Sequence, residues 1–554
     1  MKKRILLFMV MFVMLSLLVL GLSACGGDSS APAQSEAPVL TPPPSTVNVP
    51  LPPEATAPAS GGESEPAEKE YGGTVRMVVT VDTAYPFGIP WNSAANVATQ
   101  VQVPFSETLL IQYTNGTLLP WLASAWRVDV ENEEAVLTLR EDVNFSDGTK
   151  FNAEVAAWNF ERMIEEKAAN PSIAAVEVRG EYEIAIKMAG GFSNAVLPLL
   201  ASRAYGMTSR ENYEKVGADA AGEYPVCTGP FLLKEKVPGS KVTFEKSPNY
   251  WIPGKPYLDT FEYHAITDVM TQTASMLSKG DDRIDVLMQN NGEQIQTLLQ
   301  DPDLEMFTYA SGFAAIYPSS RNPDSPFANL AVRQATSAAI DRQLLCDARG
   351  FGVLEPAKQM IVNGFMGWFD DGRNYYPYDP AAAKDLLASA GYPNGIDTTL
   401  IIPQSTDREM AVAVQNMLAD VGIRCEMEFP EPGLYTELRS TTGWEGLVMG
   451  AFTNITSMTS TYRLQLDPDY QYYISTWRPV EEMLPIYDAS RVTPELDQGL
   501  FQQLHAMMAD NMVVMPLLSA NTTFIVNKAV RDGGFGQYGL GTIYRPEEIW
   551  RSTK

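Results

Sequence analysis

Histidine and cysteine are scarce in this chain, and their scarcity excludes several kinds of site. There are two histidines and four cysteines in 554 residues. Structural zinc sites are built mainly from these residue types, and a Ser-His-Asp triad needs a histidine, so both are disfavoured. We expect His264, in an alternating stretch, and His505, beside an apolar helical stripe, to have ordinary packing or hydrogen-bonding roles. The sequence predicts no metal and no cofactor.

Signatures of catalysis are also missing. The chain has no G-x-S-x-G, no Walker loop and no H-E-x-x-H. Asp281 and Asp282 follow Gly280 but lack the alternating oxygen ligands of a calcium loop, so a solvated turn is expected. Carboxylates are numerous, but no pair is flanked by an obvious substrate loop. We interpret the protein as a non-enzyme.

Basic residues are outnumbered, which argues against anionic partners. Lys and Arg total 40 against 67 Asp and Glu, for a net charge of -27. Such a chain is repelled by phosphate backbones and anionic lipid heads, so nucleic-acid binding and basic membrane docking are disfavoured. Hydrophobic residues make up 45% of the sequence, enough for large cores.

The N-terminal segment has the pattern of an export signal. Lys2, Lys3 and Arg4 precede an apolar run that ends in Leu-Ser-Ala-Cys at Cys25. This ending resembles a bacterial lipobox, which predicts a signal peptide at 1–24 and a lipidated Cys25, carrying palmitate, as the mature N-terminus. An uncleaved anchor helix is the alternative. Residues 26–70 contain no aromatic residue and ten prolines, so we expect 25–71 to be a disordered tether.

From Gly72 onward, hydrophobic periodicity predicts alternating strands and helices. The predicted strands are 74–82, 135–140, 399–403, 423–429 and 513–518, and the predicted helices are 152–167, 379–391, 407–421 and one that starts at Thr493-Pro494. The strand, helix and strand within 399–429 form a βαβ unit, which implies a parallel sheet. The C-terminal half is therefore predicted to be α/β and the N-terminal half α+β.

Aromatic side chains gather in loops beside the predicted strands, where they often form the walls of ligand sites. The groups are Tyr85, Phe87 and Trp91; Phe313 and Tyr317 with Arg321; Phe365, Trp368, Phe369, Tyr375 and Tyr376; and Trp444 with Phe452. The alternative is that most of them cover local core. Cys227, Cys346 and Cys425 leave two readings open, one disulfide or buried thiols.

Several separate stretches together resemble one family, the extracellular solute-binding protein family 5, which includes the oligopeptide-, dipeptide- and nickel-type receptors of ABC importers. The stretches are Leu119–Trp126, Leu139–Val155, Thr228–Phe231, Pro238–Ser240, Asn249–Trp251, Lys255–Asp259, Pro326–Phe327, Val332–Ala335 and Ala339–Arg342. The resemblance covers residues 72–550.

The resemblance implies a two-lobed, periplasmic-binding-protein-like fold (type II, cluster C) with an extra N-terminal subdomain. Lobe I would comprise 72–104, 225–312 and 523–554, the extra subdomain 105–224, and lobe II 313–522. A monomer would capture a solute between lobes that close by a hinge, and would deliver it to an importer permease with its ATPase. The lipid would hold the protein outside the cytoplasm, on a bacterial cell membrane.

One departure from the family pattern bears on the ligand. Peptide-binding members typically carry an Asp after the strand at 444–450, but the loop 451–460 has no acidic residue here. A buried ammonium without a counter-charge would be costly. The sequence therefore favours a neutral polar or modified small molecule or an oligosaccharide. Alternatives are an oligopeptide receptor with a non-standard amine site, a sensor without transport, and a secreted hydrolase.

The residues expected at the ligand site come from the aromatic loops and from this departing loop. They are Tyr85, Trp91, Phe313, Tyr317, Arg321, Trp368, Phe452, Thr453 and Asn454. Nickel is disfavoured because two scattered histidines are a poor ligand set.

Overall fold

The computed structural model describes residues 69–553 except 81–82, 84–85, 92–98, 290, 362, 364, 366–367, 454–458, 460–461, 464–465, 467–481, 494–496 and 539–542. All of these residues belong to one compact unit, Ser45–Lys554. The predicted signal peptide, Cys25 and nearly all of the predicted tether lie outside the described residues. Among the helices that are described, none is long and apolar enough to cross a membrane.

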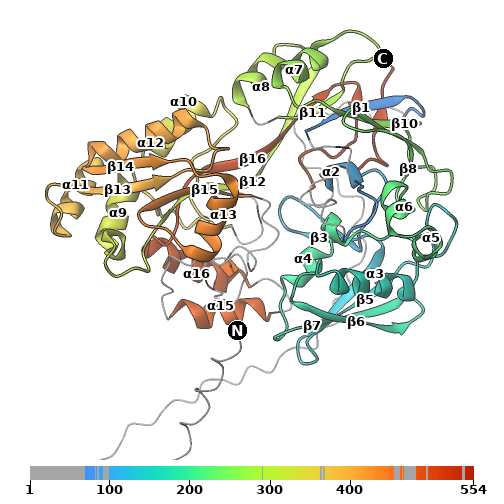
Figure 1. The fold of residues 1–554 in the computed structure, drawn as a ribbon, viewed down its shortest axis with the longest axis horizontal. Coiled ribbons are helices and arrows are strands. Elements are labelled where there is room, and N and C mark those ends of the chain that lie inside the picture. Colours follow the sequence, from blue (N-terminus) through green and yellow to red (C-terminus); the bar gives the residue numbers. More distant parts are fainter. Residues whose placement is uncertain are drawn as a thin grey trace, which may run out of the picture. The chain divides into compact units, whose positions relative to one another are not determined.

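One mixed sheet of ten strands runs through the molecule in the order β14-β13-β15-β12-β16-β11-β1-β10-β9-β8 (Figure 1). The strands are β1 (Thr74–Val79), β8 (Phe231–Val237), β9 (Lys241–Lys246), β10 (Thr260–Ala265), β11 (Val286–Met288), β12 (Leu304–Pro318), β13 (Ile396–Ile401), β14 (Ile423–Glu428), β15 (Leu447–Thr453) and β16 (Met515–Asn527). The long central strands β12 and β16 pair antiparallel from Leu304 opposite Asn527 to Ile316 opposite Met515. They are the strands that join the two halves of the sheet.

The βαβ unit predicted in the second half is confirmed. β13 and β14 are parallel, with Ile396 opposite Ile423, and α12 (Arg408–Asp420) connects them. The Asp407 side chain caps α12 by accepting from the N–H groups of Glu409 and Met410. The apolar faces of β13, β14 and α12 pack in one core with α9 (Leu330–Ala338) and α11 (Pro380–Ser389).

The predicted helix start at Thr493-Pro494 is wrong. The helix α16 runs from Gln498 to Asp510, and the Asp497 side chain caps it by accepting from the Leu500 N–H. Thr493 belongs instead to the end of the preceding helix α15 (Met483–Arg491), because its hydroxyl donates to the Ser490 carbonyl. The Thr493 hydroxyl, which precedes a proline like a typical N-cap, therefore bonds to the C-terminal end of α15 and does not cap α16.

A separate four-stranded sheet and one long helix form the core of the N-terminal half. The strands β4 (Ala123–Asp129), β5 (Glu134–Leu139), β6 (Ile173–Gly180) and β7 (Glu183–Met188) lie in the order β4-β5-β7-β6. The predicted helix is α3 (Ala153–Glu165), capped by Asn152 as expected. Large apolar side chains, among them Phe145, Phe151 and Phe160, fill the space between sheet and helix.

Shorter elements complete the chain. They are α2 (Thr99–Gln102), β2 (Leu110–Gln112), β3 (Leu118–Pro120), α4 (Val196–Leu199), η1 (Arg203–Tyr205), α5 (Arg210–Val216), α6 (Ala218–Glu223), α7 (Val269–Leu277), α8 (Gly292–Leu298), η2 (Pro326–Ala328), α10 (Arg342–Arg349), α13 (Pro432–Glu437), η3 (Leu438–Thr442), β17 (Val530–Arg531) and β18 (Trp550–Arg551).

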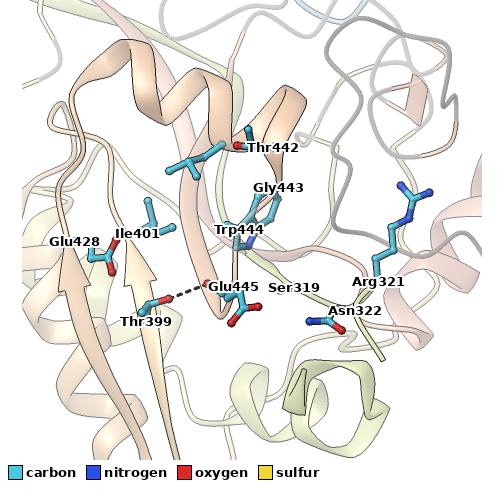
Figure 2. A pocket seen from close by; sticks show the side chains of 11 residues that line it. Ser319, Arg321, Asn322, Thr399, Ile401, Glu428, Thr442, Gly443, Trp444 and Glu445 are labelled. Atoms are coloured by element: carbon cyan, nitrogen blue, oxygen red, sulfur yellow. Dashed lines mark hydrogen bonds between the residues drawn. The ribbon is translucent and has the colours of Figure 1, made fainter. Parts of the chain in front are cut away.

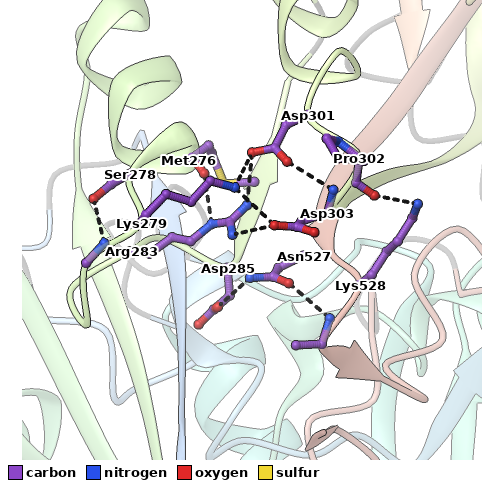
Figure 3. Close-up of polar contacts among 12 residues, drawn as sticks. Met276, Ser278, Lys279, Arg283, Asp285, Asp301, Pro302, Asp303, Asn527 and Lys528 are labelled. Carbon is purple, nitrogen blue, oxygen red and sulfur yellow. Dashed lines mark hydrogen bonds and ion pairs between the residues drawn. The ribbon is translucent and has the colours of Figure 1, made fainter. Parts of the chain in front are cut away.

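Polar contacts fix the ends of β12 and β16 where these strands enter the first half (Figure 3). The Lys279 ammonium lies 2.9 Å from Asp301 and 3.0 Å from Asp303, just before β12. The Lys528 ammonium, just after β16, donates to the Pro302 carbonyl. These contacts link the segment just before β12 to Lys279 and to the residue just after β16.

Candidate ligand-binding site

A cavity of about 600 Å³ lies in the second half of the molecule, near the carboxyl ends of two parallel strands (Figure 2). Thr399 and Ile401 reach it from β13, and Glu428 is the last residue of β14. The segment after β12 and the segment before β15 complete the wall. Their lining residues are Ser319, Arg321, Asn322, Leu438, Thr442, Gly443, Trp444 and Glu445. The ends of parallel strands are a common place for ligands to bind.

The cavity presents charges of both signs. Arg321, Glu428 and Glu445 are all exposed, and Figure 2 shows Arg321 on one side and Glu428 on the other, with Glu445 between them. The Glu445 backbone is fixed to β13, because the Thr399 hydroxyl donates to its carbonyl at 2.8 Å. Trp444 is only 6% exposed, and it packs into the apolar core beneath the cavity that it also lines. The arrangement can take a solute that carries both a carboxylate and an ammonium group.

Among the predicted site residues, Arg321 lines this cavity. Phe313 and Tyr317 lie on β12 but are only 1% and 2% exposed, within the apolar core of the same half. The Arg439 guanidinium lies 5.1 Å from the centre of the Tyr317 ring. Burial raises the pKa of Tyr317 to about 12, so the phenol stays neutral at physiological pH. Trp368 is half-buried against this same core.

Trp91 is placed elsewhere. It is 8% exposed in the core of the N-terminal half, and its ring packs edge-on against Trp158 at 5.5 Å and Tyr213 at 5.6 Å. The structure does not bring it to Arg321. In the described structure its side chain contributes to packing, the alternative that the sequence left open for aromatic loops.

The loop that departs from the family pattern is only partly described. The backbone of Phe452 and Thr453 ends β15, opposite Phe313 and Gly312, and nothing is described of their side chains. Asn454 and Tyr85 lie outside the described residues. Their roles at the site stay predictions.

Sequence reasoning missed the two carboxylates of the cavity. Glu428 is the last residue of a strand that was predicted, and Glu445 directly follows Trp444, which was noted. The available signal was therefore position at a strand end. It was hidden because an acidic chain offers many such carboxylates, and only the fold shows which of them converge.

The two histidines and the three described cysteines can now be placed. His505 is 1% exposed between the rings of Phe369 and Tyr375, and burial lowers its pKa to about 4. His264 is a strand residue on β10, as predicted, and its Nε2 lies 3.1 Å from the Glu262 carboxylate. Cys227, Cys346 and Cys425 are buried thiols, not joined in a disulfide. No cluster that could hold a metal occurs among the described residues.

A second group of charges is enclosed in the first half of the molecule. The Glu107 carboxylate, 4% exposed, accepts from the Tyr250 hydroxyl at 2.8 Å and from the indole N–H groups of Trp251 at 2.9 Å and Trp121 at 3.1 Å. Arg203 lies close enough to interact with it electrostatically. The Arg545 guanidinium covers the Trp121 ring at 4.4 Å and pairs with the buried Glu547. This group, the Glu107 cluster, surrounds a space of about 10 Å³, room for no more than one water.

Comparison with known proteins assigns the class of the molecule. The model of the bacterial extracellular solute-binding proteins, family 5 (middle), matches residues 117–473. The glutathione-binding protein GsiB of Salmonella typhi is 30% identical over 438 residues, which cover 76% of this chain and 83% of the relative. GsiB of Escherichia coli K12 is 29% identical over 370 residues, 64% of this chain and 70% of that protein.

Solved structures share the fold at lower identity. HbpA2 from Haemophilus parasuis aligns with a TM-score of 0.76 at 18% identity, covering 87% of this chain and 100% of that one. The binding protein DppA from Helicobacter pylori, in complex with the peptide STSA, aligns with a TM-score of 0.67 at 20% identity and covers 87% of this chain and 98% of its own.

The molecule is a two-lobed bacterial extracellular solute-binding protein. Within that class, the chain belongs to family 5. The predicted family and the predicted fold class are both confirmed. The relatives are named for binding a solute rather than for a reaction, which agrees with the interpretation as a non-enzyme.

Proposed function

We propose that this protein captures a solute between its two lobes and delivers it to the permease of an ABC importer, whose ATPase supplies the energy. Family membership and the two long strands that join the halves support this function. The boundaries that we propose are 72–104, 225–312 and 523–554 for lobe I, 105–224 for the extra subdomain and 313–522 for lobe II. The four-stranded sheet at 123–188 falls wholly within the proposed extra subdomain.

The solute that the geometry supports best is a short, peptide-like zwitterion. The observation that carries this choice is the cavity with Arg321, Glu428 and Glu445 among its lining residues. A guanidinium recognises a carboxylate, and a carboxylate offers the counter-charge that an ammonium needs. The missing Asp in the loop 451–460 would thus be replaced by carboxylates from other strands. The GsiB relatives, which are named for binding glutathione, point to the same class.

A neutral polar or modified small molecule, or an oligosaccharide, is the second candidate. It is favoured by the sequence of the loop 451–460, which has no acidic residue. In that case Tyr85, Trp368, Phe452, Thr453 and Asn454 would supply apolar faces and directed hydrogen bonds. A receptor that senses the same solute without transport would share this site.

Calorimetry with four probes distinguishes these candidates: glutathione, a plain tetrapeptide, the same tetrapeptide with blocked ends, and a neutral oligosaccharide. We expect the first two to bind and blocking the ends to weaken binding, because blocking removes both charges. Binding of the oligosaccharide, or tighter binding of the blocked peptide, would overturn the zwitterion proposal. Absence of binding by every probe, with no ligand co-purifying in native mass spectrometry, would count against solute capture itself.

We also propose that Cys25 is the lipid attachment site that keeps the protein at the outer face of the cell membrane. The supporting pattern is Leu22-Ser23-Ala24-Cys25 after the apolar run. In cells, Cys25→Ser should release the protein or leave an unprocessed precursor. A processed variant that stays in the membrane fraction would contradict this proposal.

A further inference from the structure

The loop between β7 and α4 reaches from the extra subdomain to lobe II. Its central contact is Asn194, which is 7% exposed and lies just before α4. Every contact described for this side chain is with a residue beyond position 450, in the proposed lobe II. The loop therefore joins two parts of the molecule that are far apart along the chain.

The polar groups of Asn194 are matched one by one. Its amide nitrogen Nδ2 donates to the Ser490 carbonyl at 2.9 Å and to the Thr493 carbonyl at 3.2 Å. Its Oδ1 accepts from the Thr459 hydroxyl at 2.6 Å. Its backbone N–H donates to the Arg491 carbonyl at 2.9 Å. Both donors, the acceptor and the main chain of one residue are thus satisfied across the contact.

Two of the partners of Asn194 are positioned by α15. Ser490 and Arg491 form the last turn of this helix, whose end carbonyls need donors from outside the helix. Ser490 is fully buried and Thr459 is 1% exposed. A second contact joins the same two regions, because the Arg463 guanidinium donates to the Ser172 hydroxyl at 3.1 Å.

Such a contact differs from an adventitious surface touch. A buried amide that loses one partner is costly, whereas a fully satisfied one fixes a unique geometry. The helix end and the asparagine complete each other only while the extra subdomain rests on lobe II. If these two parts separate, all of these groups must be hydrated again.

We propose that Asn194 is a clasp that holds the extra subdomain against lobe II and so biases the protein towards the closed arrangement. The two lobes are then joined covalently by β12 and β16 and non-covalently by the clasp between the start of α4 and the end of α15. A solute would leave only after the clasp opens. The clasp itself needs no solute, whereas its effect on release rests on the proposed function.

The test is small-angle X-ray scattering of the ligand-free protein, with wild type and Asn194→Ala compared. We expect the variant to have a larger radius of gyration, because the closed arrangement loses its contact. Asn132→Ala is the matched control: Asn132 is an exposed asparagine of the same subdomain whose described bonds are to Asp129 in its own turn and to Lys187. It should leave the radius unchanged.

A milder variant keeps the test valid if Asn194→Ala folds poorly. Thr459→Val preserves side-chain shape and removes only the donor to Oδ1, so it should shift the radius in the same direction by less. Equal radii for wild type, Asn194→Ala and Thr459→Val, with all three folded by circular dichroism, would overturn the clasp.

Solute release gives a second readout. With glutathione as the probe, Asn194→Ala should accelerate dissociation about tenfold, the factor that corresponds to 1.4 kcal/mol. An unchanged dissociation rate would overturn the role in release. If glutathione does not bind at all while the radius still increases, the clasp stands and the proposed solute class fails.

Discussion

The Glu107 cluster and the cavity around Arg321 contain the same kinds of charged side chain but differ in how far those side chains are exposed. Glu107, Arg203 and Glu547 are at most 4% exposed, and the Glu107 carboxylate is surrounded by indole and phenol donors of this chain. Arg321, Glu428 and Glu445 are exposed beside a space of about 600 Å³. Charges buried among donors and counter-charges of this chain hold its segments together, whereas exposed charges on a cavity wall are accessible to a solute.

The largest effect should come from removing the centre of the enclosed group. Glu107→Ala leaves two indoles and one phenol without their acceptor and removes the charge that opposes Arg203. We expect a loss of about 3–5 kcal/mol in the free energy of unfolding, as for other broken buried charge networks. Urea denaturation at a pH above 7 measures it. A loss below 1 kcal/mol would show that the cluster does not hold these segments together.

The second effect is a pH dependence of the unfolding free energy, which we expect from the buried Glu107 and not from the exposed cavity carboxylates. Burial raises the pKa of Glu107 from 4.5 to about 7. Because the folded carboxyl keeps its proton more firmly than the unfolded one, its contribution to stability is full at low pH and is lost as the pH rises from about 4.5 to about 7. The difference in unfolding free energy between wild type and Glu107→Gln should therefore change by about 3 kcal/mol across this window. A pH-independent difference would contradict the raised pKa.

The third effect should appear in binding and not in stability. Glu428→Gln combined with Glu445→Gln removes both carboxylates of the cavity and keeps side-chain size. We expect the affinity for a peptide with a free amine to fall about tenfold or more, equivalent to 1.4 kcal/mol. Thermal unfolding should change little, since surface substitutions usually stay within about 0.5 kcal/mol.

The control for this variant is Glu426→Gln, an exposed carboxylate on β14 that is not among the lining residues of the cavity. It should leave affinity unchanged. Equal affinity in the double variant and in wild type would remove the cavity carboxylates from the site.

The smallest effect should be that of salt. Exposed charges are screened over about 8–10 Å at physiological ionic strength, and enclosed charges much less. We expect the affinity for the zwitterion to fall modestly between low and high salt, with the stability difference between wild type and Glu107→Gln nearly constant. Calorimetry and urea denaturation at matched salt concentrations check this pair of expectations.

Much of the fold could be predicted because its elements carry local signals. Asp407 and Gly422 bound a helix that has one apolar face, and the adjoining strands read correctly as parallel. The start of α16 could not be read, because Thr493 bonds to the end of α15 instead of capping α16. Competition between two helices for one side chain has no local signature.

The site was less predictable because it depends on convergence. Arg321 was identified beside aromatic residues, but Phe313 and Tyr317 from the same strand are buried in the core. An aromatic residue has the same sequence signal in a core as at a cavity wall. Glu428 and Glu445 line the same cavity only because β14, β13 and β15 are neighbours in the sheet, and strand order is a property of the whole chain.

The two ends of the described chain close onto each other. The Thr553 hydroxyl donates to the Glu70 carboxylate across 483 residues, and the Arg551 guanidinium reaches the fully buried Asp285 beside β1. β1, the first strand described, thus waits during synthesis for the last residues before its surroundings are complete, and contacts of such long sequence separation form slowly. A nonsense mutation that removed only the final residues should damage the part of the molecule around β1, and should leave the core around β13, β14 and α12, which is synthesised later, intact.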